Sequence, residues 1–300
     1  MSIENGTYGV VLTTFDQNGK LDSESLEKEL TYCINTSVTG LLMCGSTSEF
    51  IYLSPDEYKT VLQIGAKIGN GRKVMIAGVS GGNELAVREN LDYAAECGYR
   101  YAIICPPYYY PQTPRDILSF YETVARNAPS GIKLLLYNIP FCAPEIPADI
   151  LPELIRIPNI IGMKDSSGNM LYMMKALSLV EEMKEEFSIF TGQDSTFLPS
   201  LAAGACGCMS ALAWIMDRYD TEIMDSYRNG RLEKGKELQI KLIPLIRHMD
   251  SISFPENYRA LSEVIGVYTG FPQRSFEQIQ GEYYEKWKTE AANIIKTITV

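Results

Sequence analysis

Eight short runs of apolar residues recur along the chain at intervals of roughly 30 residues. They are rich in Val, Ile, Leu and aromatic residues, and each is short enough to be a strand rather than a helix. The runs occupy residues 7–15, 38–45, 72–79, 99–107, 132–140, 158–164, 187–193 and 205–212. Because nearly continuous apolar character is typical of parallel strands buried on both faces, we expect a parallel sheet.

The segments between these runs carry apolar residues three and four positions apart, which predicts amphipathic helices. Three of the segments begin at or just after a residue whose side chain can cap a helix, namely Ser23, Ser54 and Thr113. Eight strand-then-helix repeats describe an α/β protein, and eight parallel strands can close into a (β/α)8 TIM barrel. We place this barrel, with the active site, at residues 1–225.

A doubly wound open sheet is the alternative fold, and it often carries a glycine-rich dinucleotide turn after its first strand. Residues 16–22 read DQNGKLD and lack the G-x-G-x-x-G pattern, which favours the barrel. Beyond the barrel, we expect three helices within residues 231–250, 255–268 and 275–298. No Gly/Ser-rich or Pro-rich linker precedes them, so residues 226–300 are predicted to be a helical extension packed on the barrel.

Composition and charge limit the possible functions. Hydrophobic residues make up 46% and charged residues 21% of the 300 residues, an ordinary balance for a globular chain with a sizeable core. The net charge of −10, without a basic stripe, argues against a nucleic-acid partner. No apolar run reaches the ~18 residues of a membrane span, and the N-terminus lacks the features of a signal peptide.

The seven cysteines are odd in number and several lie in strand-like runs, which predicts reduced, mostly buried thiols in a cytoplasmic protein. Cys206 and Cys208 form a C-x-C pair in a small-residue segment, where we expect a packing role. His248 is the only histidine, and its helical segment favours a surface or interface role. One histidine and scattered cysteines do not make a zinc site of familiar spacing.

Candidate chemistry lies where the predicted strands end, as in other barrels of this kind. Lys164, in IIGMKDSSGN, is the only lysine or arginine at these ends. Burial among apolar neighbours disfavours the ammonium form and leaves a nucleophilic amine that can form an imine with a ketone. Tyr137 ends the preceding run, so it should stand beside Lys164 and can shuttle protons. The structural alternatives are a solvent-reaching or ion-paired lysine and a core tyrosine.

Two further segments follow strand ends. The turn CGSTSEF (44–50) offers two hydroxyls, Ser46 and Thr47, and backbone N–H groups that can hold a carboxylate. The loop PPYYYP (106–111) carries three tyrosines between prolines, which suits a pocket wall or a subunit contact. Taken by itself, the stretch 44–50 could equally be an ordinary polar turn that binds no ligand.

In order and spacing, GSTSEF, PPYYYP, YNIP and GMKDSSGN resemble the motifs of the N-acetylneuraminate lyase / dihydrodipicolinate synthase family. The resemblance covers residues 5–225, and ELQIKLIPLI in the extension also looks like the C-terminal part of the family. It implies a (β/α)8 barrel and class I aldolase chemistry on a 2-oxo acid through a lysine Schiff base, without metal or cofactor. It also implies a tight homodimer, usually paired into a tetramer as a dimer of dimers.

The resemblance assigns roles residue by residue. Lys164 matches the imine lysine, Tyr137 the catalytic tyrosine, and Tyr109 a tyrosine that reaches into the site of a neighbouring subunit. Ser46 and Thr47 match the pair that holds the keto acid carboxylate, and Asp194 matches an Asp that binds sugar-chain hydroxyls. The complete set of expected substrate-binding residues is Ser46, Thr47, Ser48, Ser166, Gly192, Asp194 and Met209.

Three positions depart from the family pattern. Ser48 replaces the usual glycine of the turn, and it either alters the backbone or adds a hydroxyl near the site. Cys142 stands where dihydrodipicolinate synthases carry an arginine for the carboxylate of the aldehyde, which argues against aspartate semialdehyde and lysine biosynthesis. Ser195 stands where sialic acid lyases carry a glutamate, which argues against N-acetylneuraminate itself, although the tyrosine loop and Asp194 look more like that branch.

The main hypothesis is therefore reversible aldol cleavage of a 2-keto-3-deoxy sugar acid or a sialic-acid-like compound, with release of pyruvate. A sugar-acid dehydratase that uses the same imine and a dihydrodipicolinate synthase are the alternatives among enzymes. An idle barrel that binds a keto acid or a partner protein would be expected to have a damaged catalytic set. A dinucleotide oxidoreductase is disfavoured by the missing glycine fingerprint.

Overall fold

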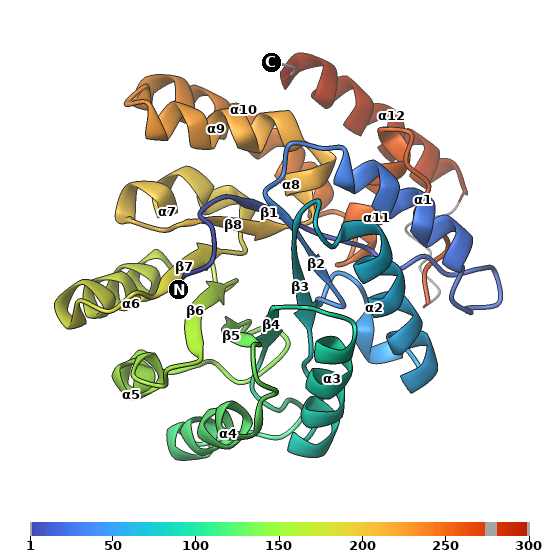
Figure 1. Ribbon diagram of the computed structural model, residues 1–300. Helices are drawn as coiled ribbons and strands as arrows, with labels where there is room; N and C mark the ends of the chain where they lie inside the picture. Colours follow the sequence, from blue (N-terminus) through green and yellow to red (C-terminus); the bar gives the residue numbers. More distant parts are fainter. Residues whose placement is uncertain (1, 274–280, 299–300) are drawn as a thin grey trace. The chain divides into compact units, whose positions relative to one another are not determined.

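The computed structural model describes residues 2–273 and 281–298. Its strands are β1 (Thr7–Val10), β2 (Gly40–Met43), β3 (Val74–Gly78), β4 (Tyr101–Ile104), β5 (Lys133–Asn138), β6 (Ile160–Asp165), β7 (Ser188–Thr191) and β8 (Gly207–Ser210). They form a closed barrel in chain order, with helices between them (Figure 1). The predicted (β/α)8 fold is confirmed, and every predicted run contains a strand.

The strands are shorter than the predicted runs at most ends, and β6 extends one residue further, to Asp165. The α-helices are α1 (Ser23–Ile34), α2 (Pro55–Gly69), α3 (Glu84–Glu96), α4 (Pro114–Asn127), α5 (Leu151–Ile155), α6 (Met170–Met183), α7 (Phe197–Ala203), α8 (Leu212–Ile215), α9 (Asp217–Arg228), α10 (Leu232–Met249), α11 (Glu256–Val264) and α12 (Gly281–Ile298). Short 3₁₀ helices are η1 (Phe50–Tyr52), η2 (Ala148–Ile150) and η3 (Asp194–Thr196). In the part of the chain that the structure describes, no helix is both long and apolar enough to cross a membrane.

The helix starts follow local sequence. Ser54 and Thr113 cap α2 and α4 as predicted, each in a capping box that is followed by a proline in the first turn. For α1 the expectation was wrong by one residue, because the cap is Asp22, whose carboxylate accepts the backbone N–H of Ser25. Ser23 is instead the first residue of that helix.

The C-terminal prediction of three helices corresponds to α10, α11 and α12. Residues 275–280 of the third predicted helix lie outside the described residues. The expected boundary after residue 225 falls within α9, and the division into a barrel and an extension stays a prediction. By its internal contacts the chain forms two compact units, one of residues 1–6 and 75–209 and one of residues 7–74 and 210–300.

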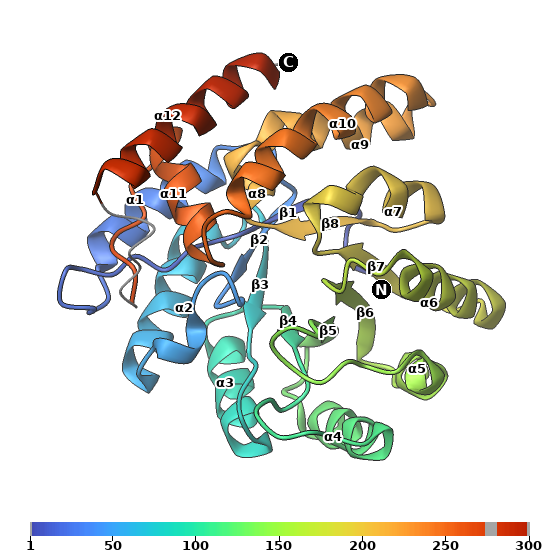
Figure 2. The ribbon, with the colours of Figure 1, turned by 180° about the vertical axis from the view of Figure 1, so that it is seen from behind.

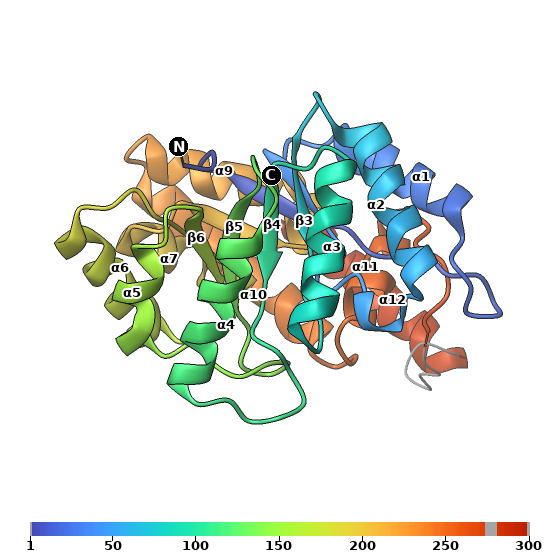
Figure 3. The same cartoon turned by 60° about the horizontal axis from the view of Figure 1, so that its bottom comes forward.

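The first unit contains a continuous parallel ladder from β4 to β7. Helices α4 and α5 lie along the outer side of this ladder (Figure 3). The N-terminal segment joins the unit at β8, where the Cys208 N–H donates to the carbonyl of Gly6 at 3.2 Å. Gly207 has φ of +154° and lies so close to the Gly6 carbonyl that any Cβ would overlap it. Backbone packing therefore requires glycine at this position.

The second unit contains β1, β2 and the C-terminal helices. The indole N–H of Trp214 in α8 donates to the Val10 carbonyl at 3.0 Å, which attaches α8 to β1. Helices α10 and α12 belong to the same unit and pack against each other (Figure 2), and His248 of α10 stacks on Trp287 of α12 with ring centroids 4.7 Å apart. The Trp287 indole N–H donates to the His248 carbonyl at 3.2 Å, so His248 takes part in the packing of α12 on α10.

Candidate active site

The register of β5 and β6 brings the two principal candidates together. Tyr137 and Lys164 are paired positions of the parallel ladder, and both side chains are buried. Lys164 Nζ lies 4.5 Å from the centroid of the Tyr137 ring. A buried amine on the face of a phenol is a cation–π geometry when it is protonated, and a nucleophile beside a proton donor when it is neutral.

Gly192 and Ser166 complete the cluster around the lysine. A Cβ on Gly192 would lie 2.6 Å from Lys164 Cε and closer still to Ser166 Oγ. The Gly192 backbone N–H donates to the carbonyl of Asp165 at 2.7 Å, which holds this glycine at the end of β6. A side chain at position 192 would occupy the space of the Lys164 side chain, so glycine is needed there. Its place at the end of a predicted strand is the signal by which the sequence identified Gly192 as a site residue.

A polar clamp directly follows Tyr137 and Lys164 in the chain and was missed by sequence reasoning. The Asn138 side-chain amide donates to Asp165 Oδ1 at 2.8 Å and accepts the Ile146 N–H at 2.9 Å. Burial raises the pKa of Asp165, and hydrogen bonds from Asn138 and Ser167 offset part of that shift. The signal was present in the sequence, since a polar residue comes immediately after both Tyr137 and Lys164.

The carboxylate-binding candidates lie in a tight turn of the second unit. Thr47 and Ser48 are buried, whereas Ser46 is partly exposed. Ser48 Oγ accepts the Gly45 N–H at 3.1 Å and donates to the Val11 carbonyl. The hydroxyl that replaces the family glycine is thus engaged by backbone groups of the turn and of the segment after β1, which favours a part in shaping the turn.

The remaining predicted residues have different surroundings. Asp194 is buried at the start of η3, and Met209 is fully buried in β8. Tyr109 is 88% exposed with φ of +84°, and its ring makes an edge contact with Tyr110 at 5.0 Å between centroids. Cys142, in the loop after β5, is exposed and has a free thiol.

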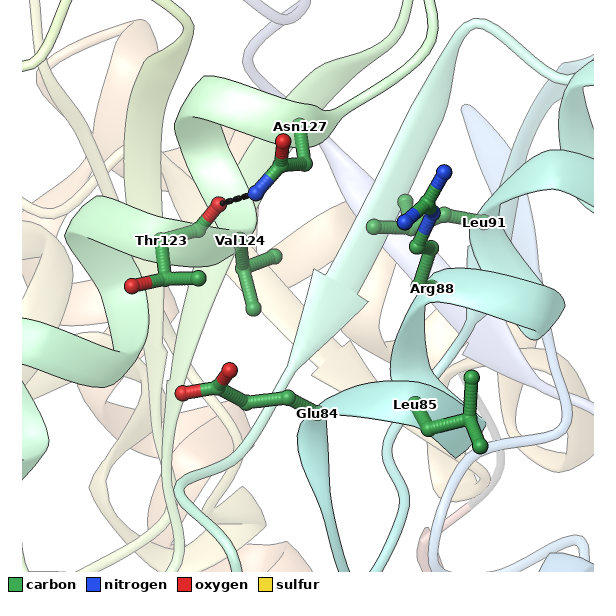
Figure 4. Close-up of a pocket in the computed structure, with 7 residues that line it drawn as sticks. All are labelled: Glu84, Leu85, Arg88, Leu91, Thr123, Val124 and Asn127. Atoms are coloured by element: carbon green, nitrogen blue, oxygen red, sulfur yellow. Dashed lines mark hydrogen bonds between the residues drawn. The ribbon is translucent and has the colours of Figure 1, made fainter.

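A groove of about 210 Å³ lies elsewhere in the first unit, between α3 and α4 (Figure 4). Its lining residues are Glu84, Leu85, Arg88, Leu91, Thr123, Val124 and Asn127. None of the predicted site residues lines it, and it contains no lysine, so it is separate from the cluster at Lys164. Among residues 2–273 and 281–298, no group of three or more Cys, His, Asp or Glu side chains is arranged to hold a metal ion.

The chain is similar in sequence to curated enzymes over most of its length. The 4-hydroxy-tetrahydrodipicolinate synthases of Methanothrix thermoacetophila and Exiguobacterium sp. are 28% and 29% identical to this chain, over 88% and 89% of its length and 88% and 90% of theirs.

Two solved structures share the fold. The dihydrodipicolinate synthase of Aquifex aeolicus superposes with a TM-score of 0.86 at 25% identity, covering 98% of this chain and 97% of its own. The N-acetylneuraminate lyase of Mycoplasma synoviae has a TM-score of 0.85 at 22% identity, with 97% of each chain covered. The preference for the lyase branch is not confirmed by these relatives. Residues 4–294 match the family model described as the dihydrodipicolinate synthetase family, and the chain belongs to that family.

Proposed function

We propose that this chain is a class I aldolase in which Lys164 forms an imine with C2 of pyruvate or of a longer 2-oxo acid. The observation that carries the proposal is the buried Lys164 amine 4.5 Å from the centre of the Tyr137 ring. Adding an amine to a ketone and removing the hydroxyl of the carbinolamine need a nucleophile and a proton-transfer group side by side. Family membership supports the same class of reaction.

In the cleavage direction, the Lys164 amine adds to the C2 carbonyl, and water leaves as the imine forms. The protonated imine accepts the electron pair of the C3–C4 bond while Tyr137 takes the proton of the C4 hydroxyl. This step gives an aldehyde and an enamine. Protonation at C3 and hydrolysis then release pyruvate and restore the amine. Condensation follows the same steps in reverse.

The rest of the substrate is assigned by the motif match. We place the carboxylate of the 2-oxo acid at the turn of Ser46 and Thr47. Ser166 and Asp194 are proposed to bind hydroxyls of the tail, and Met209 to line the site. Ser48 is given no substrate contact, because Gly45 and Val11 occupy its hydroxyl.

Two aldehyde partners are supported by different observations. The Cys142 thiol has no positive charge for a second carboxylate, which favours cleavage of a 2-keto-3-deoxy sugar acid or a sialic-acid-like compound. The curated relatives named above are 4-hydroxy-tetrahydrodipicolinate synthases, which favours the condensing activity of that enzyme. The relatives carry more weight, since they match nearly the whole chain, and the dehydratase shares the first steps with both.

The imine is tested by borohydride reduction with pyruvate, followed by peptide mass spectrometry. A reduced pyruvyl adduct on the Lys164 peptide, absent from Lys164→Ala, is the expected result. An adduct on other lysines, or none, would contradict the proposal. Aspartate semialdehyde and sugar-derived aldehydes are then compared for pyruvate consumption, and the faster aldehyde identifies the reaction.

We also propose a homo-oligomer in which Tyr109 contributes to the site of a neighbouring subunit. Its exposure of 88% and its left-handed backbone at φ +84° support this, because an exposed aromatic side chain in an unfavourable conformation commonly serves a contact. Light scattering should give the mass of a dimer or tetramer. Tyr109→Ala should lower the trapping rate, and a monomeric wild-type protein would contradict the proposal.

A further inference from the structure

A buried arginine of the C-terminal helices contacts the turn of the proposed carboxylate site. Arg259 of α11 is 2% exposed, and its Nη2 lies 2.6 Å from Glu49 Oε2. Its Nε donates to Glu256 Oε2 at 3.0 Å within α11, and its Nη1 donates to the Thr269 carbonyl. All three guanidinium nitrogens are therefore engaged, and one of them binds the last residue of the motif GSTSE.

The same arginine also reaches the turn through a second route. Arg259 Nη2 donates to the Thr13 carbonyl at 3.2 Å, and the Thr13 hydroxyl donates to the Ser48 carbonyl at 2.6 Å. Within the turn, the Glu49 N–H donates to the Ser46 carbonyl at 3.1 Å. Buried contacts thus join the arginine to the turn by two routes, directly through Glu49 and indirectly through Thr13 and Ser48.

The backbone conformation of Glu49 is the feature of the turn that these contacts hold in place. It is buried and has φ of +54°, a left-handed conformation that non-glycine residues rarely adopt. Such a conformation persists when surrounding contacts determine it, and the ion pair to Arg259 is one of these contacts. Removing Arg259 would leave the buried carboxylates of Glu49 and Glu256 without this cation, which is strongly unfavourable.

We propose that Arg259 is a positioning residue, which holds the turn of Ser46 and Thr47 in the conformation that binds the carboxylate of the 2-oxo acid. The inference rests on the proposed function. It assigns to a residue of α11 a part in preparing the turn for substrate binding. Affinity for the 2-oxo acid then depends on a residue that touches no substrate.

The test measures adduct formation on Lys164 at increasing pyruvate, with borohydride trapping. Glu49→Gln, which is isosteric, and Arg259→Met should each raise the half-saturating pyruvate concentration by about tenfold or more, because breaking a buried ion pair strongly disfavours the conformation that it holds. The rate at saturating pyruvate should change less, because Lys164 and Tyr137 are unaltered. Arg259→Lys, which keeps the charge but has a single nitrogen for these contacts, should restore only part of the affinity.

The matched control is Glu263→Gln, which removes a more exposed ion pair of α11, to Lys288 at 3.6 Å. It should keep the half-saturating concentration of the wild type. If Arg259→Met does not fold, Thr13→Val gives the same readout, because it replaces the hydroxyl that binds the Ser48 carbonyl by a methyl group of similar size. Circular dichroism establishes that each variant is folded.

The two proposals fail in different ways. A wild-type protein that forms no pyruvyl adduct refutes the proposed function. A wild-type protein that forms the adduct, with folded Glu49→Gln and Thr13→Val variants whose half-saturating pyruvate concentrations are unchanged, overturns the role of Arg259 alone. A lower saturated rate at unchanged affinity would also overturn it, since the turn would then not control binding of the carboxylate.

Discussion

Gly192→Ala is the substitution that most directly tests the geometry around Lys164. The added methyl group would lie 2.6 Å from Lys164 Cε and closer to Ser166 Oγ. Carbon atoms in contact are normally about 3.5–4.0 Å apart, so the lysine side chain must move by about 1 Å. The atoms that have to give way belong to two flexible side chains, because neither of these contacts involves backbone.

This displacement should affect the chemistry more than the fold. A misplacement of about 1 Å at a reacting group can lower a rate by about 10²-fold. Overpacking at a buried position typically destabilises by ~1–3 kcal/mol, which a folded domain of this size can tolerate. We therefore expect a folded variant in which imine formation is slowed by about 10²-fold.

The assay is the rate of borohydride-trapped adduct on Lys164 at saturating pyruvate, with urea unfolding measured in parallel. Gly82→Ala is the matched control, because a Cβ at Gly82 meets no atom within 4 Å; it should keep the wild-type rate. A folded Gly192→Ala variant that traps pyruvate at the wild-type rate would refute the argument. It would mean that the amine does not react from the position described above.

The other predictions concern buried polar groups. Burial raises the pKa of Glu29 to about 8, so the native state binds a proton that the unfolded state has lost above about pH 4.5. Wild-type stability should therefore fall by on the order of 3 kcal/mol from pH 5 to 8 relative to Glu29→Gln, measured by urea unfolding, while the exposed Glu24→Gln should follow the wild type. Ser48→Gly should lose ~1–3 kcal/mol of stability in the same assay, from its two backbone hydrogen bonds, and should leave the preference among aldehydes unchanged if the hydroxyl only shapes the turn. Asn138→Ala removes a partner of Asp165, and it should both destabilise the protein by ~2–4 kcal/mol and slow adduct formation. An unchanged rate of adduct formation would show that the contact between Asn138 and Asp165 does not affect imine formation.

Much of the fold could be predicted because its signal is local. Apolar runs and helical spacing repeat eight times, and each repeat depends only on residues near one another in sequence. The error at Ser23 shows the limit, since either of two neighbouring polar residues can cap a helix and only the backbone geometry decides for Asp22. The end of β6 at Asp165 depends likewise on ladder contacts to β5 and β7.

The candidate site could be predicted in part, because Tyr137 and Lys164 lie one residue before the ends of consecutive strands, and these parallel strands are neighbours. The role of Ser48 was left open, since the partners of its hydroxyl lie in the turn and in another segment. Arg259 was missed for a stronger reason. Its partner Glu49 is 210 residues away in sequence, and a charged residue in an amphipathic helix normally indicates an exposed face.

The register of β5 and β6 places the pair Tyr137 and Lys164 directly before the pair Asn138 and Asp165, which forms the polar clamp. Successive residues of a strand point to opposite faces, so Asn138 and Asp165 lie on the face opposite to Tyr137 and Lys164. A slip of one residue would exchange the two faces and place the clamp residues where the amine now lies. The 2.8 Å hydrogen bond between Asn138 and Asp165 occurs in the register that pairs Tyr137 with Lys164. This hydrogen bond between the last residues of β5 and β6 therefore favours the register that pairs Tyr137 with Lys164, the proposed nucleophile.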